Sequence, residues 1–244
     1  MQGLRLILVL FVLDFSQAID FCKIASCQGT EHIGCNNTMV FDKRCLRFNS
    51  LVNIGKFRRY LLAMHNKYRE DVASGALEYM PEARNMPELM WEPYLAILAE
   101  YHLKTCLADL PGQPCVATDD FPDPKSNFAE DIYPRPLVAE SNVRQMTILT
   151  EEWMDEVYDL RDTSYESAGY AIRNIINDKA AYMGCAAGKD YDLWNIHFVL
   201  VCYYSAGAPE GSSLYDVGKF NASFCPHGHS GAYPSLCKTL PLND

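Results

Sequence analysis

Residues 181–204 read AYMGCAAGKDYDLWNIHFVLVCYY, and this stretch is the clearest indication of the fold class. It holds two short apolar runs, residues 181–187 and residues 197–204, with turn-forming residues between them. Short apolar runs bounded by turn residues are typical of buried strands. We therefore predict an antiparallel hairpin near the end of the chain, with its turn at residues 188–191.

Three segments before the hairpin have the apolar periodicity of helices. They run from Lys56 to about Gly75, from Glu92-Pro93 to Cys106, and over residues 143–160. Their predicted inward faces comprise Phe57, Tyr60, Leu61, Met64, His65 and Tyr68 in the first, Leu95, Leu98, Ala99 and His102 in the second, and Met146, Ile148, Leu149, Trp153 and Val157 in the third. Residues 107–137, rich in proline and aspartate, are predicted to be a loop. Helices around a small antiparallel sheet predict an α+β fold, a three-layer α-β-α sandwich.

The first eighteen residues indicate the compartment. A positive residue, Arg5, precedes a short apolar run, and Ser16-Gln17-Ala18 fits a cleavage site. We predict a signal peptide at residues 1–18 and a secreted, extracellular product that does not span a membrane.

Ten cysteines follow that segment, and an even count without a tight Cys-x-x-Cys pair indicates disulfides rather than a zinc framework. Cys185 and Cys202 are placed to join the two hairpin strands, and Cys225 and Cys237 to close a loop in the tail.

The charge of the chain excludes some partners. A net charge of −10 argues against nucleic acid and against anionic membrane surfaces. Two sequons, at Asn36 and Asn221, predict glycosylation of an exported chain.

A set of short motifs resembles the CAP superfamily of cysteine-rich secretory proteins, antigen five and class-one pathogenesis-related proteins. The motifs are His65-Asn66-x-x-Arg69, Met90-Trp91-x-x-x-Leu95-x-x-x-Ala99, Trp153-x-x-Glu156, Met183-Gly184-Cys185-Ala186 and the run Phe198-Val199-Leu200-Val201-Cys202-Tyr203-Tyr204. The N-terminal cysteines are similar to those of the insect venom-allergen (antigen five) branch. The resemblance implies the pairs Cys22–Cys35, Cys27–Cys115, Cys45–Cys106 and Cys185–Cys202, with Cys225–Cys237 as an extra bridge. It also divides the chain into the signal peptide at 1–18, a cysteine-rich arm at 19–55, a CAP domain at 56–208 and a C-terminal extension at 209–244.

Members of this superfamily hold a cavity lined by two histidines and two glutamates, which in several members binds a divalent metal, often zinc. By motif, the glutamates correspond to Glu130 and Glu156. The first histidine position falls on Leu110, and the second falls on Tyr170 or Ala171. Because both imidazoles are missing, we predict a degenerate cavity with no metal, no cofactor and no catalytic residue.

The prediction that follows is a non-enzymatic secreted protein that binds an extracellular protein or a small apolar ligand in venom, saliva or seminal fluid. A second hypothesis is a metal-dependent hydrolase in which Glu130 and Glu156 recruit His102 or His197. The sequence is also compatible with a sterol or fatty-acid binder and with a purely structural coat protein. His65 is predicted to be a hydrogen-bonded core residue.

Overall fold

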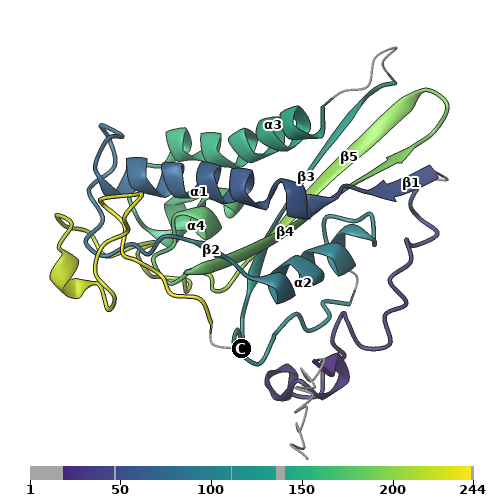
Figure 1. The fold of residues 1–244 in the computed structure, drawn as a ribbon, viewed down its shortest axis with the longest axis horizontal. Coiled ribbons are helices and arrows are strands. Elements are labelled where there is room, and N and C mark those ends of the chain that lie inside the picture. The colour runs from purple at the N-terminus through teal and green to yellow at the C-terminus, as the bar shows by residue number, and fades with distance from the viewer. Residues whose placement is uncertain (1–18, 47, 111, 136–140, 243–244) are drawn as a thin grey trace, which may run out of the picture.

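A five-stranded sheet lies between two helical layers (Figure 1). The computed structural model describes residues 19–46, 48–110, 112–135 and 141–242, and the predicted signal peptide lies outside the described residues. The strands are β1 (Phe48–Leu51), β2 (Met90–Trp91), β3 (Lys125–Pro134), β4 (Tyr182–Tyr191) and β5 (Asn195–Tyr204), and the α-helices are α1 (Arg58–Ala73), α2 (Pro93–Leu103), α3 (Asn142–Asp155) and α4 (Tyr170–Ile175). Short 3-10 turns are η1 (Phe21–Lys23), η2 (Ala25–Cys27), η3 (Ile54–Lys56), η4 (Glu156–Asp159), η5 (Tyr165–Ser167) and η6 (Ala222–Phe224). The predicted α+β sandwich is confirmed.

The apolar run in β5 has two faces, and each face builds one core. Phe198 and Leu200 pack with α1, α3 and α4, whereas Val199 and Val201 pack against α2. Side chains alternate across a strand, so a strand that is covered on both faces must be apolar at consecutive positions. This is why β5 reads as an unbroken apolar run.

The hairpin turn is not where we predicted it. β4 continues through residues 188–191, because this segment pairs with β1 on one side and with β5 on the other. The turn comes at residues 192–194, where the Asp192 carboxylate accepts the backbone N–H groups of Trp194 and Asn195, each at 2.7 Å. β1 comes from a distant part of the sequence, and its pairing with β4 extends β4 past Gly188.

The loop prediction for residues 107–137 is wrong over β3. This ten-residue strand pairs along its whole length with β5, from Lys125 opposite Tyr204 to Pro134 opposite Asn195. Its proline stands at the end of the strand, on the edge of the sheet, where proline is tolerated. A long partner strand therefore overrides the local composition.

Smaller differences concern the ends of elements. β1 gives the arm a strand, and β2 runs parallel to β4, so the sheet is not wholly antiparallel. α2 ends at Leu103, and the third predicted helix ends at Asp155 before the turn η4. Tyr60 and Ile148, both predicted to point inward, are 37% and 40% exposed.

The motif His65-Asn66-x-x-Arg69 is structural throughout. The Asn66 side chain pairs with both backbone groups of Leu89. The buried Arg69 guanidinium makes five hydrogen bonds to backbone carbonyls before β2, at the last residue of α4 and after α4. One helix face thus fixes two distant loops, because their buried carbonyls need donors.

Five disulfides are present, and they are the pairs that the resemblance implies: Cys22–Cys35, Cys27–Cys115, Cys45–Cys106, Cys185–Cys202 and Cys225–Cys237. Cys185 and Cys202 face each other across β4 and β5 and are fully buried. Two of the five bridges join the arm to the segment that follows α2. Within the described residues, none of the helices combines the length and apolar character that crossing a membrane requires.

Candidate functional site

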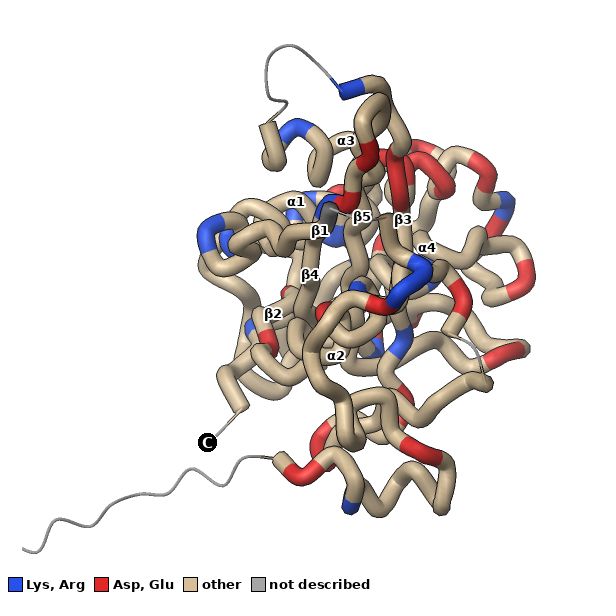
Figure 2. Tube along the Cα trace, turned by 90° about the vertical axis from the view of Figure 1, so that its right-hand side faces the viewer, with Lys and Arg blue, Asp and Glu red and all other residues tan. Residues whose placement is uncertain are grey.

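Four of the five predicted cavity residues line one cavity beside the edge strand β3. Glu130, Glu156, Tyr170 and Ala171 surround a volume of about 400 Å³, together with Glu152 and Trp153 of α3 and with Ala108, Phe128 and Ala129. We call it the edge cavity. It lies in the part of the molecule where acidic residues gather around β3 (Figure 2).

Leu110 lies apart from these four residues. It lines a neighbouring cavity of about 690 Å³, and Tyr170 contributes to the walls of both. Leu110, the predicted position of the first histidine, has an apolar side chain with no donor atom for a metal ion.

Glu156 is engaged with the start of α4. Its Oε2 atom accepts the backbone N–H groups of Ala171 and Ile172, each at 2.8 Å. A carboxylate at this place pairs with two of the N–H groups that have no partner within the first helical turn, and it interacts favourably with the helix dipole. Gly169 permits this approach, because a Cβ atom there would lie 2.5 Å from the same oxygen.

The segment of residues 169–185 spans the predicted position of the second histidine and ends in strand β4. Its first part is the short helix α4, and this helix uses Glu156 as its cap. The sequence signals were a glycine followed by residues with helical periodicity. The partner carboxylate lies 15 residues earlier, so the pairing itself had no local signal.

Glu130 contacts a histidine that belongs to neither family position. Glu130 Oε2 lies 2.8 Å from Nε2 of His197, and the other ring nitrogen, Nδ1, lies 2.7 Å from Oδ1 of Asp190. The register of the sheet explains this contact, because Asp190 stands directly opposite His197 and Glu130 stands diagonal to it on β3. Asp190 is buried, and its Oδ2 accepts the N–H of Leu46 from the arm at 2.8 Å.

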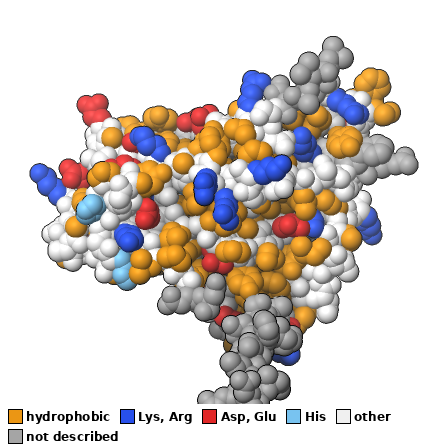
Figure 3. All heavy atoms as spheres, in the orientation of Figure 1, with side chains coloured by type: hydrophobic (Ala, Val, Ile, Leu, Met, Phe, Trp, Pro, Cys, Tyr) orange, Lys and Arg blue, Asp and Glu red, His pale blue; other side chains and the backbone are white. Residues whose placement is uncertain are grey.

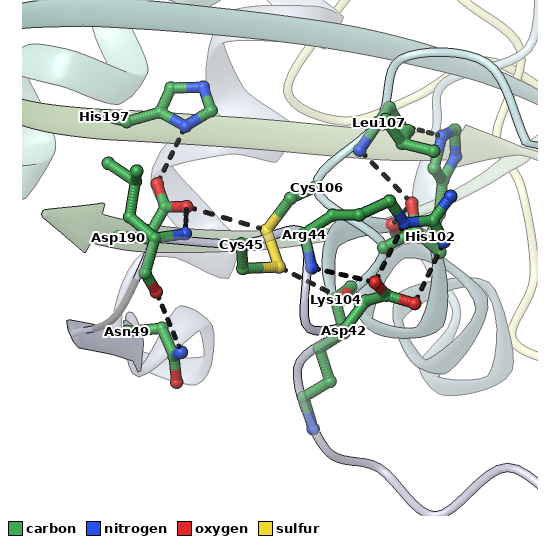
Figure 4. The surroundings of a disulfide bond; sticks show 12 residues. Asp42, Arg44, Cys45, Asn49, His102, Lys104, Cys106, Leu107, Asp190 and His197 are labelled. Atoms are coloured by element: carbon green, nitrogen blue, oxygen red, sulfur yellow. Dashed lines mark hydrogen bonds and ion pairs between the residues drawn. A yellow bond between two sulfur atoms is a disulfide. The ribbon is translucent and has the colours of Figure 1, made fainter.

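The disulfide Cys45–Cys106 lies against the same aspartate (Figure 4). Cys106 Sγ is 3.8 Å from Asp190 Oδ2. Among the residues that the structure describes, Cys45, Cys106 and Asp190 form the one close group of three His, Cys, Asp or Glu side chains. Because the two sulfurs are bonded to each other, they present no thiolate to a metal ion.

His65 and His102 are both engaged in the core. Nδ1 of His65 lies 2.8 Å from the Leu61 carbonyl oxygen and Nε2 lies 3.0 Å from the Tyr204 hydroxyl, which confirms its predicted core role. Burial lowers the pKa of His65 to about 4.

Nε2 of His102 faces two carbonyl oxygens, those of Leu107 and Ala108, so this nitrogen carries the hydrogen. Nδ1 then accepts from the Tyr203 hydroxyl at 3.2 Å. Burial lowers the pKa of His102 as well. A surrogate ligand role for His102 would break these contacts.

The two predicted glycosylation sites, Asn36 and Asn221, lie on the exposed surface. His229 and His227 occupy exposed positions in the tail, and Nδ1 of His229 lies 2.9 Å from the Ser230 carbonyl oxygen.

Known proteins share this fold and sequence pattern. The model of the cysteine-rich secretory protein family, CAP, matches residues 62–204. The chain is 24% identical over 252 residues to Venom allergen-1 of Aedes albopictus, and the match covers 97% of this chain and 94% of that protein. It is 27% identical over 244 residues to Tabinhibitin 3 of Tabanus yao, with 95% and 92% covered. A solved structure described as NaASP2 with Zn2+ has a TM-score of 0.54 at 17% identity, and the match covers 81% of this chain and 99% of that one.

Proposed function

The chain belongs to the CAP family of cysteine-rich secretory proteins, and we propose that it is a secreted, non-enzymatic binding protein with a degenerate cavity. The observation that carries the proposal is the pair of hydrogen bonds that the Glu156 carboxylate accepts from the backbone of α4. One oxygen of this carboxylate is bonded to two backbone amides of α4, so the residue serves the fold.

The remaining cavity positions support the same function. Zinc sites in proteins are built from imidazole, thiolate and carboxylate ligands, usually four in number or three with a water. The edge cavity contains Glu130 and Glu152 beside Glu156, and its other described walls are apolar or aromatic. Carboxylates alone at this number make a poor zinc site, and the known chemistry of the family cavity depends on the imidazoles that this chain lacks.

Five disulfides and the venom-allergen relatives support secretion into an extracellular fluid. In such a fluid, we propose, the protein binds a protein partner or a small apolar ligand through its disulfide-linked surface loops.

The test is the zinc content of the purified secreted protein after dialysis, measured by elemental analysis. We expect substoichiometric zinc in the wild-type protein. The same measurement on Glu156→Ala is compared with Glu152→Ala, because Glu152 lines the cavity without capping α4. One tightly held zinc ion per chain that Glu156→Ala removes and Glu152→Ala retains would overturn the proposal.

One observation favours the metal-dependent hydrolase as a second candidate. The contact of Glu130 with His197, and the approach of Asp190 to the far nitrogen of the ring, place an oriented imidazole beside a cavity carboxylate. In this candidate, hydrolysis of a peptide or ester by the purified protein requires added zinc. The activity disappears in His197→Gln and survives in His229→Gln.

A further inference from the structure

A groove separate from the edge cavity lies beside the start of α1. It encloses about 690 Å³ between the start of α1, the segment of residues 88–93 around β2, and the C-terminal tail at residues 238–241. We call it the tail groove. It shares no lining residue with the edge cavity.

Three basic side chains line the tail groove. Arg58, Arg59 and Lys238 are exposed, and none of them makes a side-chain ion pair or hydrogen bond with another described residue. Figure 3 shows basic side chains gathered over this part of the face, with hydrophobic side chains between them. This local positive charge contrasts with the net charge of −10 for the chain.

The arginines have no evident role in the fold. Arg58 and Arg59 are the first two residues of α1, where positive charge opposes the helix dipole. Among the described residues that line the groove, Glu88 is the one acid, and its carboxylate accepts a hydrogen bond from the Ser230 hydroxyl at 2.6 Å. The groove therefore has positive charge to offer a ligand.

The walls of the groove are apolar. They comprise Leu62, Leu89, Met90, Trp91, Pro93, Leu240 and Pro241. Cavities of a few hundred cubic ångströms with apolar walls and a few charged groups are typical of small-molecule sites.

The tail wall is fixed in place. The disulfide Cys225–Cys237 immediately precedes it, the Thr239 hydroxyl donates to the Glu88 carbonyl at 2.6 Å, and the Tyr182 hydroxyl donates to the Leu240 carbonyl at 2.8 Å. A preformed groove binds with a smaller entropy cost than one that must order on binding.

We propose that the tail groove binds an amphipathic organic anion, with a carboxylate or phosphate head at Arg58, Arg59 and Lys238 and an apolar body against Met90, Trp91 and Leu240. Arginine pairs with both head groups through two parallel hydrogen bonds. The apolar body gains the free energy of leaving water.

The test is isothermal titration calorimetry of the full secreted protein with four probes that share one alkyl chain: decanoate, decyl phosphate, decanol and decylammonium. We expect one anion to bind per chain, more tightly than decanol, and with affinity that falls as salt rises. The tighter of the two anions identifies the head group as carboxylate or phosphate. Decylammonium should not bind.

The variant Arg59→Gln/Lys238→Gln should weaken binding of the preferred anion about tenfold, since each exposed charge contact contributes a factor of a few. The matched control Lys43→Gln/Lys219→Gln removes the same charge at two positions that do not line the groove and should leave the affinity unchanged. Leu240→Asp should abolish binding while the protein keeps its wild-type circular dichroism. Equal affinity for decanol and decanoate, or equal weakening by the control pair, would overturn the proposal.

Discussion

Acidification should destabilise the protein through His65. This ring is fully buried, and burial lowers its pKa from 6.5 to about 4. Between these two values the unfolded chain binds a proton that the folded chain refuses, so stability is fully present above pH 6.5 and is lost as the pH falls toward 4. Integrating over this window, we expect His65 alone to remove about 2 kcal/mol of unfolding free energy between pH 7 and pH 5.

The assay is urea unfolding at pH 7, 6 and 5 with the disulfides intact, on the wild-type protein and on His65→Gln. The glutamine loses the contact with Tyr204 and is less stable at pH 7, but it has no proton to gain. Its loss of stability between pH 7 and 5 should be smaller than that of the wild type by about 2 kcal/mol. The residual slope belongs to groups such as His102 and His32, whose pKa values burial also lowers. Identical slopes for the two proteins would contradict the assignment to His65, and His229→Gln, at an exposed position, controls for the substitution itself.

Three further outcomes follow from single contacts. Arg69→Met should cost about 3–5 kcal/mol of unfolding free energy in urea titrations, because it leaves buried carbonyls without donors; a loss within about 0.5 kcal/mol, the range of an ordinary surface substitution, would contradict this role. Gly184→Ala should lower the thermal midpoint by several degrees, since its Cβ would collide with the backbone of α2 at Ala96, and an unchanged midpoint in calorimetry would argue against that close packing. Glu156→Ala should cost about 1–2 kcal/mol through loss of the α4 cap, and Glu152→Ala should stay within about 0.5 kcal/mol of wild type in the same titration.

The hairpin illustrates how local and distant information combine. Its two apolar runs follow from the sequence, because strands buried on both faces need apolar residues at consecutive positions. The turn lies at residues 192–194 rather than at the predicted residues 188–191, because β1 pairs with the end of β4 from more than a hundred residues away.

β3 shows where residue composition fails to predict secondary structure. Its segment contains proline and acidic residues that are typical of loops, yet it pairs with β5 over ten residues. Backbone pairing with a strand that is already fixed in the core outweighs weak local preference.

Residue type and periodicity along the chain were enough to specify the layer architecture and most of the helix faces. Only the packed molecule shows what Glu130 and Glu156 contact. Glu156 caps α4, and Glu130 contacts His197, whose other ring nitrogen faces Asp190, a residue that also bonds the arm. Packing also places around one apolar groove three cations that have no ion pair among the described residues. These contacts join residues far apart in sequence, so they arise only when the layers come together.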